Sequence, residues 1–330
     1  MDDTGKRAKS PEKKIRLVYK TALGRMYAGL AEKVLAQPAL QPWRGRVQML
    51  FTSPPFPLQR EKKYGNLQGD AFAGWLGGFA RQFADMLTPD GSIVIELGNG
   101  WNPGTPTMST ASLKALLAFQ EAAGLHLCQE FICYNPARLP TPAEWVTVRR
   151  VRVKDSFTRV WWLSPTPHPK ADNRKVLTDY SPSMRKLLER GSYNGGKRPS
   201  GHHIGAKSFL TNNGGAIPPN VLVPPGSDAP FDPHAVLPIS NTASRNAYHR
   251  ACRDQKKEAH PAVMPESLVD FFVQFLTDPG DVVLDPFAGS NTTGAVAERL
   301  GRRWLAIEAN PTYAESSKVR FGEGGEKKAA

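Results

Sequence analysis

Residues 281–308, DVVLDPFAGSNTTGAVAERLGRRWLAIE, constrain the fold more than any other segment. DVVLD predicts a short buried strand, and the proline and glycine of PFAGSN predict a tight turn after it. A helix is expected from Thr292 to Leu300 with Asn291 as its N-cap, and then a strand that ends in Glu308. Strand, turn, helix and strand in this order form the unit of a parallel sheet that is covered by helices.

The first 140 residues show the same alternation. Apolar runs and the spacing of large apolar residues predict, in order, a strand at 46–51, a helix at 72–87, a turn at 88–91, a strand at 92–97, a helix at 113–121 and a strand at 127–134. Residues 268–276 predict a buried helix near the other end of the chain. We therefore expect an α/β fold with a mostly parallel sheet.

Residues 141–258 interrupt the alternation. Their Gly, Pro, Asn and Ser content, as in YNGGKRPSGHHIG and TNNGGAIPPN, predicts loops and turns rather than a packed sheet. Aromatic residues are interleaved with the arginines in this region. A plain linker would not carry them, so we expect loops that wrap around a polyanion. Trp161 and Trp162 are expected in the core, with stacking on a base as the alternative.

Basic residues are concentrated in the same region. The chain has 43 Lys and Arg against 30 Asp and Glu, a formal net charge of +13. Between Arg138 and Lys207 there are 15 basic and 5 acidic residues. A surplus in one segment is typical of a nucleic-acid-binding surface, and a merely basic surface is the alternative.

The sequence argues against several other classes of protein. No run of 18 apolar residues is present, so no membrane span is expected, and the N-terminus lacks the apolar segment of a signal peptide. The three cysteines have no CxxC spacing, and His202-His203 has no further ligand at matching spacing, so we expect neither disulfides nor a metal. The tails at 1–16, which is basic, and 322–330 are expected to be disordered.

The turn after Asp285 has the features of a cofactor site. Gly289 leaves room for a ligand against the backbone, and an acid at Glu308 suits a pair of ribose hydroxyls. A dinucleotide site would need GxGxxG, of which this turn has one glycine, and a lone glycine is also common in purely structural turns. S-adenosylmethionine, which has no phosphates, fits better, with Asp285 at its amino acid end.

The segment FTSPPF, residues 51–56, ends a predicted strand at two prolines. Ligands of open α/β sheets bind beyond the carboxyl ends of strands, so Ser53 would lie beside the cofactor if the strands before it and before Asp285 are neighbours. The Ser53 hydroxyl and the Pro54 carbonyl could accept the hydrogens of an exocyclic amine, which is a poor nucleophile, and Phe56 could stack on a flipped-out base. An ordinary Pro-Pro turn is the alternative.

TSPPF followed late in the chain by DPFAGSNTTG resembles the β-class amino-methyltransferases of DNA, in which the catalytic motif precedes the S-adenosylmethionine motif. SPPF rather than DPPY is similar to the N4-cytosine branch. The segments TSPPFPLQREKKYGN, NPARLPTPAEWV, RVKDSFTRVWWLS, RPSGHHIG, NGGAIPPN and HPAVMPESL also resemble the PvuII-type modification methyltransferases, over residues 20–320.

This resemblance implies a Rossmann-like methyltransferase fold in circularly permuted motif order. It implies a catalytic half at 17–140, an inserted target-recognition region at 141–258 and a cofactor-binding half at 259–321. The implied catalytic residues are Ser53, Pro54, Pro55 and Phe56. The implied cofactor-binding residues are Thr52, Asp285, Pro286, Phe287, Gly289, Ser290, Asn291, Thr292, Glu308 and, from the His-Pro-Ala segment, Pro261. The family usually has an acid after the glycine that corresponds to Gly29; this chain has Leu30, so either Glu32 substitutes or the adenine is bound less specifically.

The resemblance further implies that the protein methylates N4 of a cytosine in duplex DNA by direct in-line transfer. The candidate DNA contacts are Arg149, Arg150, Arg152, Lys154, Arg159, Lys197, Arg198 and His202. The alternatives are methylation of adenine N6, a non-catalytic DNA-binding protein with this fold, and an RNA or protein methyltransferase. The expected partner is double-stranded DNA. A cognate restriction endonuclease is compatible with the resemblance, and no physical complex with it is required. The protein is expected to be a monomer or homodimer in the cytoplasm of a prokaryote or phage host, at the nucleoid.

Overall fold

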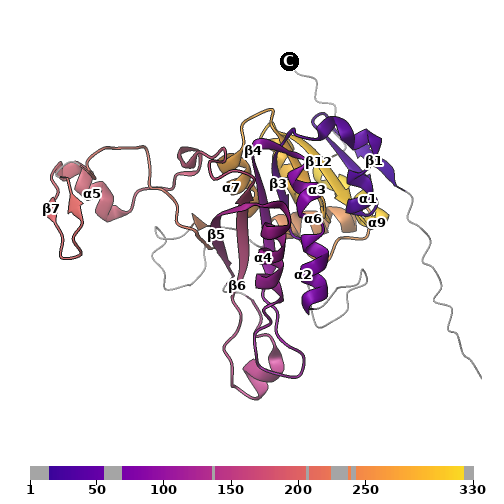
Figure 1. Cartoon of the computed structure of the whole chain (residues 1–330), viewed down its shortest axis with the longest axis horizontal. Helices are drawn as coiled ribbons and strands as arrows, with labels where there is room; N and C mark the ends of the chain where they lie inside the picture. Colours follow the sequence, from indigo (N-terminus) through magenta and orange to yellow (C-terminus); the bar gives the residue numbers. More distant parts are fainter. Residues whose placement is uncertain are drawn as a thin grey trace, which may run out of the picture.

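The computed structural model describes residues 15–55, 69–135, 138–205, 208–223, 237–238 and 243–322. Within these residues one large sheet forms the centre of the molecule, with helices on both faces (Figure 1). Its strand order is β1-β2-β12-β11-β3-β4-β6-β5-β9-β10, and β7 and β8 form a separate hairpin. The predicted α/β fold is confirmed.

Parallel strands make up the middle of the sheet. They are β2 (Gly24–Ala28), β12 (Arg303–Glu308), β11 (Val282–Asp285), β3 (Val47–Thr52) and β4 (Leu87–Gly98). The late strands β11 and β12 lie between the early strands β2 and β3, so the end of the chain completes a sheet that its beginning starts. The flanking strands are β1 (Arg16–Lys20), β6 (Phe157–Ser164), β5 (His126–Tyr134), β9 (Val221–Val223) and β10 (Leu237–Pro238).

Two sets of helices cover the sheet, because successive side chains of its buried strands point to opposite faces. Leu50 packs in a core with residues of α1 (Ala31–Leu35), α2 (Gly69–Gly77), α3 (Ala80–Ala84) and α4 (Ala111–Ala123). Phe51 packs on the other face, with α7 (Glu266–Leu276), α8 (Thr292–Arg299) and α9 (Pro311–Ser316). The other helical segments are η1 (Pro38–Trp43), η2 (Glu144–Val148), η3 (Asn173–Val176), α5 (Pro182–Arg190), α6 (Ala243–Asp254) and η4 (Ser317–Phe321).

No helix in the described part of the chain has both the length and the apolar character that crossing a membrane would need.

The structure corrects three local predictions. The helix predicted at 72–87 is divided into α2 and α3, and Leu87 begins β4 (Leu87–Gly98) instead. Residues 88–91 are not a separate turn, because β4 runs through them and its pairing with β3 shifts between Leu87 and Ser92. The extra residues are taken up as an irregularity within the strand. The prediction of loops throughout 141–258 is wrong in three places: residues 157–164 form β6 between β4 and β5, and α5 and α6 are regular helices. The predicted burial of Trp161 and Trp162 is confirmed, since both lie in β6.

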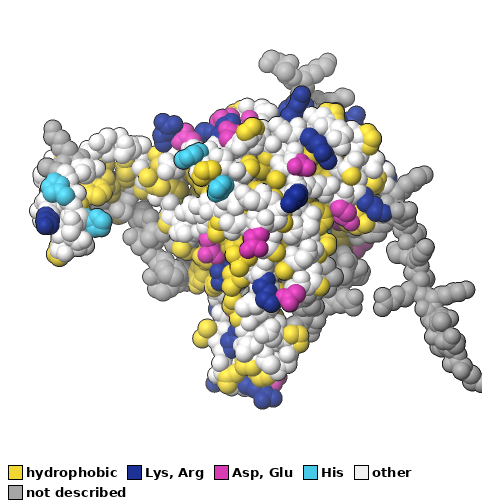
Figure 2. Space-filling view, viewed as in Figure 1, with side chains coloured by type: hydrophobic (Ala, Val, Ile, Leu, Met, Phe, Trp, Pro, Cys, Tyr) yellow, Lys and Arg dark blue, Asp and Glu magenta, His cyan; other side chains and the backbone are white. Residues whose placement is uncertain are grey.

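Two segments project away from the sheet (Figure 1). The arm, residues 138–156, connects β5 to β6, contains η2 and extends below the sheet in this view. The lobe, residues 178–205 and 208–216, lies to the left and contains α5 with the hairpin of β7 (Gly196–Lys197) and β8 (His203–Ile204). Lys and Arg side chains gather with apolar ones at the tip of the arm (Figure 2). Both projections belong to the region of basic surplus.

Candidate active site

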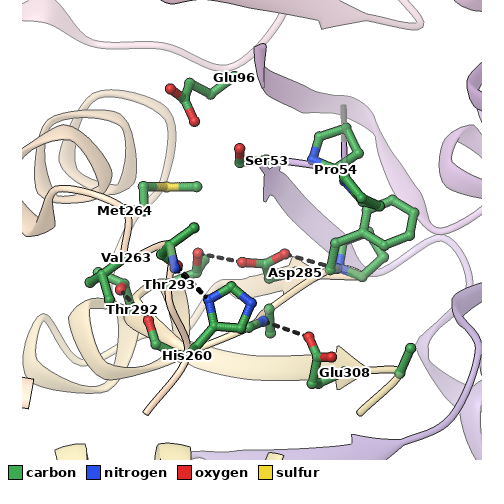
Figure 3. Close-up of a pocket in the computed structure, with 18 of the residues that line it drawn as sticks. Ser53, Pro54, Glu96, His260, Val263, Met264, Asp285, Thr292, Thr293 and Glu308 are labelled. Atoms are coloured by element: carbon green, nitrogen blue, oxygen red, sulfur yellow. Dashed lines mark hydrogen bonds between the residues drawn. The ribbon is translucent and has the colours of Figure 1, made fainter. Parts of the chain in front are cut away.

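A cavity of about 880 Å³ lies at the carboxyl ends of the central parallel strands (Figure 3). Such a volume is typical of sites for small molecules and cofactors. Ser53, which follows β3, and Gly289, which follows β11, both line it. The predicted convergence of these two distant turns is therefore confirmed, and its cause is the parallel pairing of β3 with β11.

A buried hydrogen bond joins the two turns. The hydroxyl of Thr52 donates to Oδ1 of Asp285 at 2.8 Å. The same carboxylate accepts the backbone N–H of Phe287 at 3.1 Å and the hydroxyl of Thr293 at 2.7 Å. Asp285 is only 3% exposed, and its burial raises its pKa to about 6 although the three hydrogen bonds favour the charged form. This carboxylate holds the Ser-Pro-Pro turn after β3 and the loop after β11 in a fixed relation.

Gly289 is required by the shape of the loop around it. Its φ is +52°, and a Cβ at this position would lie 3.1–3.3 Å from three ring atoms of His260. Its N–H donates to Oε2 of Glu308 at 2.9 Å, and the other oxygen of Glu308 accepts the N–H of Asn310 at 2.7 Å. The loop and the end of β12 are thus locked together at the place where the sequence predicts a ribose.

The predicted cofactor residues fall into two groups. Thr52 and Asn291 are buried and are not among the residues that line the cavity, so they support its wall from behind. Asn291 has a φ of +54°, caps α8 through Gly294 at 3.0 Å and donates to the hydroxyl of Tyr19 at 3.0 Å. The others line the cavity itself: Asp285, Pro286, Phe287, Gly289, Ser290, Thr292, Glu308 and Pro261.

Leu30 and Glu32 also line the cavity, at the position where the sequence departs from the resembled family. Glu32 is exposed and starts the first turn of α1, whereas Leu30 precedes that helix. Both side chains are therefore available to a ligand that reaches this rim.

The other end of the cavity carries the Ser-Pro-Pro turn, for which the sequence predicts a catalytic role. Ser53, Pro54 and Pro55 line it, and Phe56 lies outside the described residues. The carboxylate of Glu96 lies on the same side as the Ser53 hydroxyl, and Met264 lies opposite (Figure 3). Arg138 and Thr158 complete this end. We refer to Ser53, Pro54, Glu96, Arg138 and Thr158 as the base end of the cavity.

Glu96, Thr158 and Met264 were not predicted as site residues from the sequence, and Arg138 was predicted only as part of the basic surplus. Glu96 had a signal, since it is an acid inside an otherwise apolar strand, SIVIEL. No comparable signal marks the others, because they come from separate elements that only the sheet order brings together.

The predicted DNA contacts are distributed over three elements. The arm carries Arg149, Arg150, Arg152 and Lys154, β6 carries Arg159, and the hairpin of the lobe carries Lys197, Arg198 and His202. Among the described residues, Arg149 pairs with Glu144 at 2.7 Å, Arg152 with Asp155 at 2.9 Å and Arg159 with Glu130 at 2.9 Å. Arg150 is exposed and has a φ of +55°. The arm and the lobe thus present charge on two separate surfaces.

Comparison with known proteins identifies the family of the chain. A family model described as DNA methylase matches residues 47–319. The chain is 41% identical over 305 residues to the type II methyltransferase M.PvuII of Proteus hauseri. The aligned residues cover 92% of this chain and 85% of that protein.

Two solved structures show the same architecture. The PvuII DNA methyltransferase, described as cytosine-N4-specific, matches with a TM-score of 0.69 and 35% identity over 93% of this chain and 89% of its own. A DNA modification methylase of Thermus thermophilus in complex with S-adenosyl-L-methionine shares the fold, with a TM-score of 0.52 and 19% identity over 91% of this chain and 94% of its own. The protein described here therefore belongs to the DNA methylase family.

Proposed function

We propose that this protein transfers a methyl group from S-adenosylmethionine to the exocyclic N4 of a cytosine at a specific site in duplex DNA. One observation carries the proposal: the Thr52–Asp285 hydrogen bond of 2.8 Å brings the Ser-Pro-Pro turn and the cofactor loop to one cavity. The relative with 41% identity is a type II methyltransferase, and a solved relative is named cytosine-N4-specific.

The residues of the cofactor loop fit S-adenosylmethionine. The bare backbone at Gly289 gives a flat ligand close approach, and the carboxylate of Glu308 lies beside it for the ribose hydroxyls. Leu30 offers an apolar surface to the adenine and Glu32 an acceptor for its amino group. Asp285 contributes negative potential at the amino acid end. When bound, S-adenosylmethionine supplies an electrophilic methyl group on its sulfonium sulfur.

The base end makes a weak nucleophile reactive. The lone pair of N4 is delocalised into the ring of cytosine, so N4 must become more tetrahedral to react. The Ser53 hydroxyl and the Pro54 carbonyl accept hydrogen bonds from the two N4 hydrogens, which favours that geometry and aims the lone pair toward the cofactor loop. The carboxylate of Glu96 stabilises the positive charge that develops on N4 and can accept the proton that is released.

The DNA must deliver a flipped-out base, because a cytosine inside the duplex cannot reach a cavity at the strand ends. The exposed charges of the arm and the lobe bind phosphates or guanine edges on either side of the target. A monomer can methylate one strand at a time, in the cytoplasm at the nucleoid, and would protect the DNA from a cognate restriction enzyme without contacting that enzyme.

Digestion of methylated DNA to nucleosides tests the proposal. DNA incubated with the protein and labelled S-adenosylmethionine should yield N4-methylcytosine, identified by mass. A product that is only N6-methyladenine, or no label in DNA, would contradict it. Mapping the modified positions in host DNA would give the target site.

A further inference from the structure

The base end of the cavity contains a cation that the proposed mechanism does not use. Among the described residues that line the cavity, Arg138 is the only arginine or lysine. It lies where β5 passes into the arm and is half-buried. Glu96 of β4 and Thr158 of β6 line the same end of the cavity.

Arg138 is held in place by the backbone. Its Nη1 donates to the carbonyl of Phe157 at 2.9 Å, and its own N–H donates to the carbonyl of Asn135 at 3.2 Å. A guanidinium has five N–H donors. Within the described residues Arg138 forms no ion pair, in contrast to Arg152 of the same arm, which pairs with Asp155 at 2.9 Å. Donors of Arg138 therefore remain for a ligand in the cavity.

Ser53, Pro54 and Glu96 cannot distinguish cytosine from adenine. Both bases present an amino group and, next to it, a ring nitrogen that accepts. Ser53, Pro54 and Glu96 recognise the amino group, which the two bases share. The bases differ at the next position, where cytosine has the 2-oxo acceptor and adenine has a C–H group. A fixed donor at this position would accept cytosine and leave adenine with an unpaired contact.

We propose that Arg138 selects cytosine by donating a hydrogen bond to the 2-oxo group of the flipped base. The inference rests on the proposed function, since it assumes that the base enters with its amino group at Ser53. The 2-oxo group lies on the far side of the ring nitrogen from the amino group, and the proposal places it toward Arg138 of the arm and Thr158 of β6, which both line the cavity. Arg138 is then a specificity-determining residue, and Ser53 is the catalytic one.

A chemical double-mutant cycle tests the hydrogen bond. The kcat/KM of the natural protein and of Arg138→Met is measured on two duplexes, one with the target cytosine and one with an aminopyridine C-nucleoside that keeps the amino group and ring nitrogen but has hydrogen in place of the 2-oxo group. Losing a charge-assisted hydrogen bond should lower kcat/KM about 10- to 100-fold, either by the base change or by Arg138→Met. Both changes together should cost no more than one of them.

A third duplex, with adenine at the target position, measures selectivity. Arg138→Met should leave the slow methylation of adenine within about threefold of that of the natural protein, so the preference for cytosine falls by the factor that is lost on cytosine. The proposal is overturned if Arg138→Met keeps its rate on cytosine, or if the rates on all three bases fall by one common factor. If Arg138→Met lowered the rates on all three bases by one factor and also made DNA binding less dependent on salt, Arg138 would be identified as a phosphate contact instead.

Matched variants separate this role from folding. Arg152→Met removes an arginine of the same arm that does not line the cavity, and it should lower the three rates equally, if at all. Arg138→Met should still bind S-adenosylmethionine with unchanged affinity, measured by calorimetry without DNA. If the natural protein makes no N4-methylcytosine, the proposed function fails; if it does and the cytosine preference survives Arg138→Met, only the inference about Arg138 fails.

Discussion

The cofactor loop, Asp285–Thr292, and the arm are held in opposite ways. In the loop, polar groups are paired within the chain: Asp285 accepts three hydrogen bonds, and the guanidinium of Arg320 donates to the carbonyl of Ser290 at 2.7 Å. In the arm, apolar side chains face solvent, with Val148 69%, Val151 63% and Val153 84% exposed. The Arg149–Glu144 pair is also exposed, so it adds little to stability.

This difference fits the two ligands that we propose, S-adenosylmethionine for the loop and DNA for the arm. A small cofactor must find its site already formed, because it makes too few contacts to organise a loop as it binds. DNA supplies many charges of its own, so an arm can leave arginines and apolar side chains exposed until phosphates and bases cover them. Substitutions in the loop, or in the Ser-Pro-Pro turn that is hydrogen-bonded to it, should therefore have large effects on cofactor binding or methyl transfer. Single substitutions in the arm should have small effects on DNA binding that depend on salt.

Ser53→Ala should have the largest effect, because it removes an acceptor that acts on the reacting nitrogen. Methyl transfer in single-turnover experiments should slow on the order of 100- to 1,000-fold. The Thr52–Asp285 hydrogen bond does not involve the Ser53 side chain, so the affinity for S-adenosylmethionine should be unchanged. A variant that loses cofactor affinity as well would show that the two ends of the cavity are not separately held.

Gly289→Ala should weaken cofactor binding about tenfold, because the added Cβ would displace the His260 ring that lines the cavity. Gly124→Ala is the control, because Gly124 has a similar φ of +62° and open space around its Cβ position. The control should lower the melting temperature and leave the cofactor Kd unchanged. Equal Kd values for both variants would mean that the close approach to His260 does not shape the site.

The pH dependence of stability tests how deeply the loop is buried. The pKa of Asp285 is raised to about 6 in the folded protein from 3.8, so the folded state holds this proton more tightly. The resulting stabilisation is fully present below about pH 4 and is lost as the pH rises through about 6. Relative to Asp285→Asn, which does not titrate, the free energy of unfolding should fall by about 1 kcal/mol between pH 5 and pH 7. The free energies of unfolding are measured by urea titration at each pH. If they changed with pH in the same way for the natural protein and for Asp285→Asn, a buried Asp285 would be contradicted.

The same contrast explains what the sequence could predict about the fold. The strand before Asp285 and the helix after Asn291 were predictable, because apolar runs bounded by Pro, Gly and an N-cap are local signals. Residues 157–164 were not, because β6 carries Arg159 and lies among loop-forming segments; its place in the sheet depends on pairing with β4 and β5. The pattern that looks like a turn at 88–91 is absorbed by a shift in the pairing of β4.

The site was predictable to the same extent. Ser53 and Gly289 stand in short motifs whose chemistry is local, and sheet order then predicts that they meet. The same two motifs also contain Thr52 and Asn291, although both are buried behind the residues that line the cavity. Arg138 could not be placed, because an arginine at the edge of a basic region is indistinguishable from a solvated one until the arm is folded beside β6.

Arg150→Ala should have the smallest effect and tests the arm. Arg150 is exposed at a positive φ of +55°, and within the described residues it forms no ion pair, so its charge is available to a phosphate. Loss of one phosphate contact should reduce DNA affinity a few-fold and lower the slope of log K against log salt by about 1. Arg81→Ala is the control: this arginine lies on α3, away from the arm, and donates to the carbonyl of Ala122 at 2.8 Å, so its removal should leave the slope unchanged. If Arg150→Ala left the slope unchanged as well, the arm would not bind DNA phosphates through this residue. Its exposed valines would then have to be covered by a partner other than DNA.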